Sequence, residues 1–155
     1  MIGLGKLGMP IAETIAECGH EVRGCDIFPK VMPATVAWAT PAELVPWADI
    51  IFAAPQTPHA PEYEGVTRLP ATRVDFDYSY LKECVAEVVD EAVRQQRHVN
   101  LVVISTCLPG TFDREIAPLL DPLVNYIYQP LFIAMGTERE DFLNPEFVVA
   151  GGRDL

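Results

Sequence analysis

The first ten residues decide the fold: Met1-Ile-Gly-Leu-Gly-Lys-Leu-Gly-Met-Pro10, with glycine at positions 3, 5 and 8. We interpret this stretch as a strand that turns sharply into a helix. In such a turn Gly3 permits the tight bend, Gly5 leaves room for a ligand against the backbone, and Gly8 lets the helix pack closely on the strand. The start of the helix presents free N–H groups and a partial positive charge, which favours a bound pyrophosphate.

The residues after this turn predict that the pyrophosphate belongs to a dinucleotide. Residues 9–18 are expected to form the helix, Gly19 to end it, and residues 21–25 to form the next strand. Asp26 follows that strand, where an acidic side chain accepts hydrogen bonds from the adenosine ribose and repels the additional phosphate of NADP. The sequence therefore predicts an NAD site, with Lys6 as a cation close to the phosphates.

Composition and charge exclude several other classes of protein. The chain has 155 residues, half of them hydrophobic, which predicts one globular domain over residues 1–155. It has no apolar run long enough to span a membrane and no export signal, so we expect a cytoplasmic protein with no membrane contact. The net charge of −11 opposes binding to nucleic acid. The cysteines and histidines lack the close spacing of metal ligands, so no metal site is predicted.

The apolar runs predict a doubly wound α/β fold with a mainly parallel, Rossmann-like sheet of six strands. Residues 101–104 are continuously apolar, as is typical of a strand that helices cover on both faces. Only two residues precede Gly3, so we expect the first strand to be short. The six expected strands are the stub at Met1 and residues 21–25, 50–54, 99–105, 126–128 and 147–150.

Between these strands the spacing of apolar residues predicts helices and one long loop. Residues 41–47 are expected to form a short helix and residues 78–96 a long one. Thr111 and Asp113 are candidate caps for a further helix. Residues 56–77 lack periodicity and predict a loop at the ligand end of the third strand. This loop is interpreted either as a flap over the cofactor or a sugar, or as a surface excursion or contact loop.

Four segments of the chain, in order, carry motifs of a known enzyme family. The most specific is residues 141–152, in which Asp-Phe-Leu-Asn-Pro precedes a strand that ends Gly-Gly. The other three are residues 2–10, which many dehydrogenases share, residues 49–58 and residues 105–111. Together they resemble the amino-terminal domain of the UDP-glucose/GDP-mannose dehydrogenase family, and the resemblance spans essentially the whole chain.

The resemblance implies an activity and a set of site residues. Enzymes of that family use NAD twice to oxidise the C6 hydroxyl of a nucleotide sugar to a carboxylate, through an aldehyde held on a cysteine. Pro55 and Thr57 would lie beside the cofactor and Thr106 near the nicotinamide, where its uncharged hydroxyl can orient a water, so Thr106 is the candidate catalytic residue. The residues implied to hold the adenosine and pyrophosphate half are Gly3, Gly5, Lys6, Leu7, Gly8 and Asp26.

Departures from the family pattern bear on catalysis. Where the family has two carboxylates in Asn-Pro-Glu-Phe-Leu-Arg-Glu-Gly, residues 129–136 read Gln-Pro-Leu-Phe-Ile-Ala-Met-Gly, with Leu131 and Met135 in their place. Loss of a positioned acid–base group typically costs about 10²–10⁴ in rate. The family's nucleophilic cysteine belongs to later domains. We therefore expect this chain to bind NAD without oxidising a sugar by itself, the nucleotide sugar being held by a missing or separate domain.

Two other interpretations stay open. One is the 3-hydroxyisobutyrate/6-phosphogluconate dehydrogenase group, which is similar in its opening Gly-Leu-Gly motif but needs a catalytic lysine on a following helical domain. The other is a stand-alone NAD-binding module without catalysis, consistent with Leu131 and Met135. Cys107 is interpreted as a small apolar filler, because no nearby histidine or cation cluster would lower its pKa for attack on an aldehyde. Assembly as a homodimer and the identity of the sugar are left open.

Overall fold

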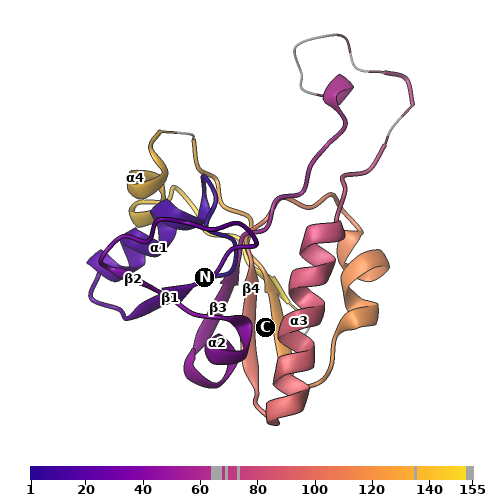
Figure 1. Ribbon diagram of the computed structural model, residues 1–155. Helices are drawn as coiled ribbons and strands as arrows, with labels where there is room; N and C mark the ends of the chain where they lie inside the picture. Colours follow the sequence, from indigo (N-terminus) through magenta and orange to yellow (C-terminus); the bar gives the residue numbers. More distant parts are fainter. Residues whose placement is uncertain (64–67, 69, 73, 135, 153–155) are drawn as a thin grey trace.

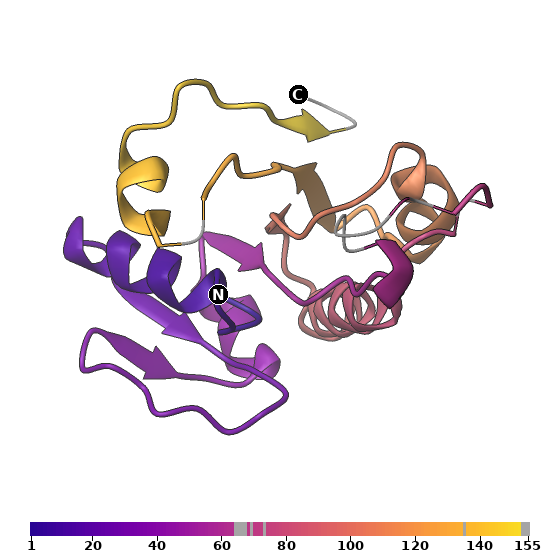
Figure 2. The same cartoon turned by 90° about the horizontal axis from the view of Figure 1, so that it is seen from above.

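Helices cover both faces of a mainly parallel sheet in the computed structural model of the chain (Figure 1). Seen from above in Figure 2, α1 (Gly8–Glu17) and α4 (Glu138–Leu143) lie together on one side, and α3 (Ser79–Gln95) lies on the other. The structure describes residues 1–155 except 64–67, 69, 73, 135 and 153–155.

The first strand lies at the centre of the sheet and is reduced to one residue. Ile2 forms parallel bridges with both Cys25 and Ala53, and so joins a two-stranded sheet to a four-stranded one. The resulting order is β2, β1, Ile2, β3, β4, β5, β6, and only the pair β5–β6 is antiparallel among the described residues. The strands are β1 (Val22–Gly24), β2 (Val36–Trp38), β3 (Ile50–Ala53), β4 (Val99–Val103), β5 (Val124–Tyr128) and β6 (Gly151–Gly152).

The predicted fold class is confirmed, while two strands differ from the prediction. β2 was not predicted, because its three residues Val-Ala-Trp are too few to show an alternation of apolar and polar side chains. The strand expected at residues 147–150 is wrong. Those residues are irregular and exposed, and the short β6 begins only at Gly151, which pairs with Tyr128.

Alternate residues of β4, and Ile104 directly after it, pack on the two faces of the sheet. Leu101 and Val103 belong to the core cluster that includes α2 (Pro41–Trp47) and α3, whereas Val102 and Ile104 belong to the cluster that includes α1. All four side chains are 5% exposed or less. A strand that is covered on both sides has no polar face, which explains the continuous apolar run in the sequence.

The segment after β4 departs from the predicted helix. It forms a π-helical turn over Phe112–Ile116 and a 3₁₀ turn over Ala117–Leu119. Thr111 precedes the π-helical turn, yet its side chain makes no capping hydrogen bond. Its hydroxyl instead lies 2.7 Å from the Leu108 carbonyl oxygen and 3.0 Å from the Tyr78 hydroxyl.

The described residues of the long loop over residues 56–77 extend away from the body above the start of α3 (Figure 1). Its base is closed by a hydrogen bond of 2.8 Å from the Asp77 N–H to the Pro58 carbonyl. The rings of His59 and Phe76 lie 6.1 Å apart across the same base. Both interpretations of this loop, flap and surface excursion, stay predictions.

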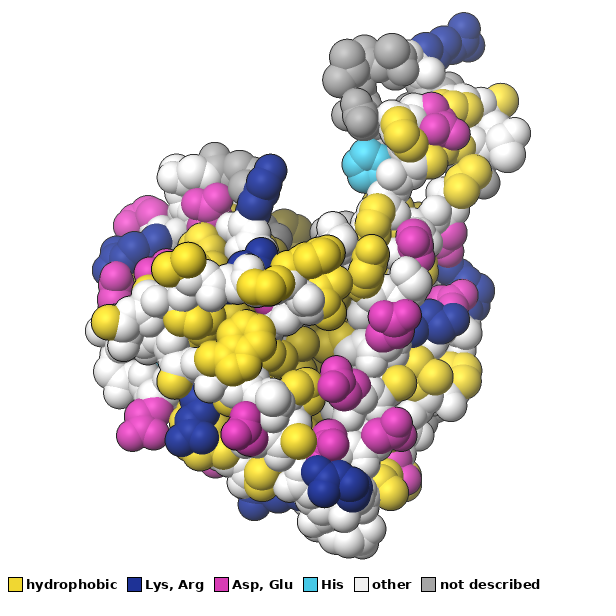
Figure 3. Space-filling view, in the orientation of Figure 1, with side chains coloured by type: hydrophobic (Ala, Val, Ile, Leu, Met, Phe, Trp, Pro, Cys, Tyr) yellow, Lys and Arg dark blue, Asp and Glu magenta, His cyan; other side chains and the backbone are white. Residues whose placement is uncertain are grey.

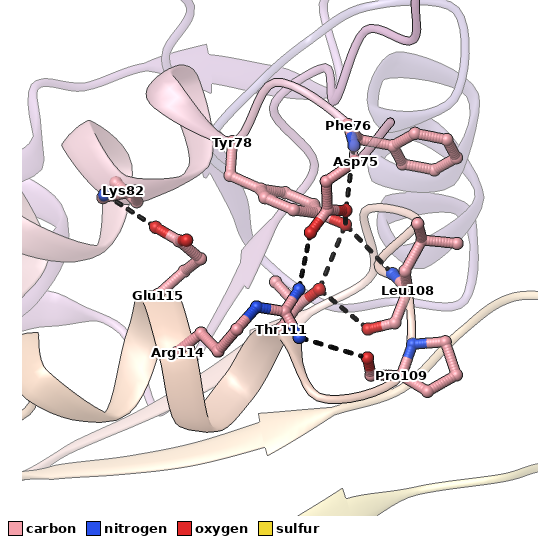
Figure 4. A network of polar contacts seen from close by, with 9 residues as sticks. All are labelled: Asp75, Phe76, Tyr78, Lys82, Leu108, Pro109, Thr111, Arg114 and Glu115. Carbon is pink, nitrogen blue, oxygen red and sulfur yellow. Dashed lines mark hydrogen bonds and ion pairs between the residues drawn. The ribbon is translucent and has the colours of Figure 1, made fainter. Parts of the chain in front are cut away.

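Tyr78 ties the base of this loop to the segment that follows β4 (Figure 4). Its hydroxyl donates to Asp75 Oδ1 at 2.8 Å and accepts from the Leu108 N–H at 3.1 Å. The hydrogen bond from Tyr78, together with the ion pair with Arg114, holds the pKa of Asp75 below its usual value. Because Tyr78 is only 5% exposed, water cannot readily replace these hydrogen bonds.

Replacing Tyr78 by Phe is expected to lower the free energy of unfolding by about 1–3 kcal/mol, because the buried Tyr78 ring then loses its hydrogen bonds with Asp75, Leu108 and Thr111. Urea unfolding followed by circular dichroism measures the change. Tyr80→Phe is the matched control, since the Tyr80 hydroxyl forms no hydrogen bond within the described part of the chain. Equal stability of the two variants would contradict the role given to Tyr78.

Candidate functional site

A cavity of about 840 Å³ opens at the carboxyl ends of the parallel strands, which are the single-residue strand at Ile2 and β1, β2, β3 and β4. Figure 3 shows this face of the molecule, where hydrophobic side chains gather around a hollow between the half that carries α1 and β1 and the half that carries α3. Ligands of open parallel sheets bind at this edge. Eight of the nine residues predicted to bind the cofactor line the cavity: Gly3, Gly5, Lys6, Leu7, Asp26, Pro55, Thr57 and Thr106.

The ninth, Gly8, lies beneath the turn, and the three glycines meet three different surroundings. Gly3 has φ +87°, and a Cβ atom there would lie 2.6 Å from the Ala54 carbonyl oxygen. A Cβ atom on Gly8 would lie 1.9 Å from the Gly3 carbonyl oxygen. A Cβ atom on Gly5 would have no atom within 4 Å, so its backbone faces the open cavity. These surroundings agree with a bend at Gly3, an approach surface at Gly5 and close packing at Gly8.

Asp26 is held in place at the end of β1 before any ligand arrives. Its Oδ2 accepts the Leu4 N–H at 2.8 Å, and its Oδ1 accepts the Phe28 N–H at 2.9 Å. Lys30 Nζ lies 3.8 Å from Oδ2. Each oxygen of a carboxylate can accept more than one hydrogen bond, so both keep capacity for a pair of ribose hydroxyls.

Two hydroxyl groups join the loops that follow β3 and β4. Ser105 is 5% exposed and donates a hydrogen bond of 2.6 Å to the Pro55 carbonyl. Thr57 donates one of 2.8 Å to the Thr106 carbonyl. The three predicted residues of this side, Pro55, Thr57 and Thr106, therefore lie on one connected surface of the cavity.

Sequence reasoning missed the wall of the cavity that lies opposite the glycine turn. Four residues of α3 line the cavity; they are spaced by three and four positions and so lie on one face of the helix. Trp38 lines the cavity from the end of β2. Lys30 was also missed, although it follows Asp26 by four residues. The helical spacing was visible in the sequence, but nothing there showed that this face meets the cofactor edge. The four α3 residues are Tyr80, Glu83, Cys84 and Glu87.

Cys107 has the properties of a filler side chain. Its thiol lies 3.6 Å from the Ser105 carbonyl oxygen, to which it donates. Burial, and then the negative charge of Asp75, raise the pKa of Cys107 to about 11. The group is a neutral thiol at physiological pH, and a neutral thiol is a poor nucleophile.

The structure describes Leu131, one of the two residues that stand in place of family carboxylates. Leu131 is half-buried and packs against the core cluster under α1, which includes Val102 and Ile104. A carboxylate in this apolar contact would lose its hydration without a partner. Met135 lies outside the described residues.

Two general features of the described residues bear on other functions. No helix among them is long and apolar enough to cross a membrane. Within the same residues, no group of three or more His, Cys, Asp or Glu side chains is placed to hold a metal ion.

The two glycines with opposite surroundings give a matched pair of variants. Gly8→Ala is expected to lower the free energy of unfolding by at least about 2 kcal/mol, because its methyl group would overlap the Gly3 carbonyl. Gly5→Ala, with open space around it, should change that energy by no more than about 0.5 kcal/mol. Urea midpoints of the two purified variants test this. A stable Gly8→Ala protein would refute the packing.

The raised pKa of Cys107 predicts its reactivity. At pH 7 only about one thiol in ten thousand is ionised at a pKa of about 11, so iodoacetamide should modify Cys107 far more slowly than the exposed Cys18. The rate should climb with pH until the thiol titrates near pH 11, and should rise at once in urea, where burial is lost. Peptide mass spectrometry resolves the two sites. Equal labelling at pH 7 would contradict the assignment.

Comparison with known proteins identifies a consistent set of relatives. No protein-family model matches the chain. The UDP-glucose 6-dehydrogenase AglM of Haloferax volcanii is 23% identical over an alignment that covers 99% of this chain and 40% of that enzyme. This chain therefore spans 40% of the length of the curated relative that it matches.

Solved structures give the same result for the fold. A GDP-mannose dehydrogenase from Pseudomonas aeruginosa superposes with a TM-score of 0.79 at 23% identity, and a UDP-glucose dehydrogenase from Pyrobaculum islandicum with 0.76 at 24%. Each alignment covers 99% of this chain and 40% of the solved one. A UDP-D-ManNAc dehydrogenase from Pyrococcus horikoshii follows at 0.67. The resemblance to the UDP-glucose/GDP-mannose dehydrogenase family is confirmed, and the fold is that of the matched part of these nucleotide-sugar dehydrogenases.

Proposed function

We propose that this chain is the NAD-binding part of a nucleotide-sugar 6-dehydrogenase of the UDP-glucose/GDP-mannose type. The observation that carries the proposal is the cavity, in which the glycine turn and the fixed carboxylate of Asp26 lie along one edge of the sheet. The likeness to nucleotide-sugar dehydrogenases over 99% of the chain supports it.

In this proposal the cofactor lies along the carboxyl ends of the strands. Its pyrophosphate rests on the open backbone at Gly5, with Lys6 close by, and the start of α1 supplies partial positive charge. The adenosine ribose donates to Asp26. The nicotinamide, which accepts the hydride, lies beside Pro55 and Thr106. These two residues belong to the two loops that the Ser105 and Thr57 hydrogen bonds connect.

Thr106 is the residue that we propose for proton handling. Its side chain is exposed at the cavity, and its backbone is fixed by the hydrogen bond from Thr57. A hydroxyl at this place can orient the alcohol or a water next to the nicotinamide without carrying charge.

The grip on the sugar and the covalent chemistry are proposed to lie outside this chain. It matches 40% of the length of its relatives, and the half-buried Cys107, with its raised pKa, is unsuited to attack an aldehyde. The neutral Leu131 likewise supplies no acid or base. The chain therefore binds NAD in this proposal and oxidises a nucleotide sugar only together with a further domain, in the cytoplasm.

Leu131 also favours a second candidate, a stand-alone NAD-binding module without catalysis. Its side chain is part of the packing under α1, so this position contributes to stability and not to proton transfer. The two candidates predict the same cofactor and differ in whether a sugar-binding partner exists. Of the dehydrogenase groups weighed from the sequence, the relatives found support the nucleotide-sugar enzymes over the 3-hydroxyisobutyrate/6-phosphogluconate group.

Calorimetric titration with NAD and NADP tests the proposal. The chain should bind NAD at least about tenfold more tightly than NADP, because Asp26 repels the additional phosphate. Asp26→Asn should reduce this preference by about tenfold, since it removes the repulsion and leaves Lys30 free to attract the phosphate.

Asp49→Asn is the matched control for that substitution. Asp49 is exposed and precedes β3, at the end of the strand away from the cavity, so this variant should keep the wild-type preference. Absence of NAD binding by the folded wild-type chain would refute the proposed function. Equal affinity of the wild-type chain for NAD and NADP would refute the role of Asp26.

A further inference from the structure

Trp38 is a large aromatic side chain that contributes little to the core. It is 47% exposed, and it belongs to neither core cluster of the described residues. Its strand is anchored by another residue, Val36, which is 2% exposed and packs in the cluster under α1. Burying an indole releases much free energy, so an indole left half in water at a cavity wall marks a place where a ligand can cover it.

The order of the strands fixes where Trp38 lies relative to the proposed cofactor. The pyrophosphate site follows Ile2, and the ribose site follows β1, the next strand. β2 lies beyond β1, and in their parallel register Gly24 pairs with Trp38. Neighbouring strands are about 4.8 Å apart. Moving from one strand end to the next along this edge therefore covers about the width of one group of the dinucleotide, such as the ribose or the base.

The group that follows the ribose in this direction is the adenine base. Trp38 lines the same cavity as Asp26, and it does so at the end of the strand that adjoins the strand of Asp26. Another wall comes from α3, where Tyr80 and Cys84 line the cavity, and Pro41 lines the same cavity with an apolar surface.

We infer that the indole of Trp38 is the platform on which the adenine ring of NAD stacks. The inference rests on the proposed function, because it needs the dinucleotide to lie along this edge. Stacking of a base on an aromatic ring needs no hydrogen-bond partner and removes from water the two ring faces that meet. The indole thereby supplies affinity for the adenine end of the cofactor, while Asp26 sets the choice between NAD and NADP.

The two tryptophans of the chain give a direct spectroscopic test. Trp47 is part of the core packing and lies under the Arg23 guanidinium, 4.3 Å from the ring centroid, and it does not line the cavity. Trp47→Phe therefore leaves Trp38 as the single tryptophan, which excitation at the red edge of the indole band selects over the tyrosines. NAD and ADP should quench its fluorescence on stacking, and nicotinamide mononucleotide should not. In Trp38→Phe, where Trp47 is the reporter, NAD should bind without this quenching.

Calorimetry of the 155-residue chain gives the second readout. Trp38→Ala should weaken the binding of NAD and of ADP by about tenfold each and leave nicotinamide mononucleotide unchanged. Trp38→Phe, which keeps an aromatic face, should retain most of the affinity, and Trp47→Phe should retain all of it.

The outcomes separate this inference from the proposed function. Unchanged affinity of Trp38→Ala for NAD, or quenching of Trp47 in place of Trp38, would overturn the platform and leave the NAD site intact. Failure of the folded wild-type chain to bind NAD would overturn both. Equal losses for ADP and nicotinamide mononucleotide would also overturn the platform, because they would show a general disturbance of the cavity.

Discussion

The close contact between Gly8 and the Gly3 carbonyl is the constraint on which the rest of the structure depends. The start of α1 lies directly on the turn that leaves Ile2, so closely that no side chain fits between them. This contact sets where the helix begins, and the helix in turn covers one face of the sheet through Ile11 and Ala12, which are fully buried. The same geometry leaves the backbone at Gly5 bare toward the cavity. Fold and candidate site are thus consequences of one steric requirement.

Hydroxyl groups, and not regular secondary structure, position the far side of the cavity. Ser105, Thr57 and Tyr78 each bond to a backbone group of a loop, and Tyr128 accepts the Cys107 N–H at 3.2 Å. The loop after β4 contains no strand or α-helix until the π-helical turn begins at Phe112. Loops that carry function need this kind of support, because sheet and helix hydrogen bonds do not extend to them.

Much of the fold could be predicted from residue patterns, for physical reasons that also explain the errors. α2 matches its predicted bounds, and α1 and α3 lie within about one residue of theirs, because the spacing of their apolar side chains is fixed by burial. β2 was not predicted because three residues are too few to show an alternation of apolar and polar side chains. The strand expected at residues 147–150 failed because its apolar residues Phe147, Val148 and Val149 are exposed, so hydrophobicity there does not report burial in a sheet.

The candidate site divides in the same way. The glycine turn and Asp26 could be predicted because each needs a particular residue type at a particular place. Trp38 and the α3 wall could not, because their meeting depends on how β2 and α3 fold against each other across the cavity. A sequence motif records local requirements, whereas a cavity wall is assembled from segments that lie far apart in the sequence, such as Trp38 and Tyr80.

The single-residue strand at Ile2 has a mechanical consequence. The sheet has a seam there, where one parallel bridge to Cys25 and one to Ala53, beside the hydrogen bond from the Met1 amino group to the Arg23 carbonyl, join the two-stranded part to the four-stranded part. A dinucleotide placed as proposed would cross this seam, with its adenosine on one half and its nicotinamide on the other. Such a ligand would contact both parts of the sheet, and by mass action it would stabilise the folded state in which the two parts are joined. The bound cofactor would then help to hold the two parts of the sheet together at Ile2.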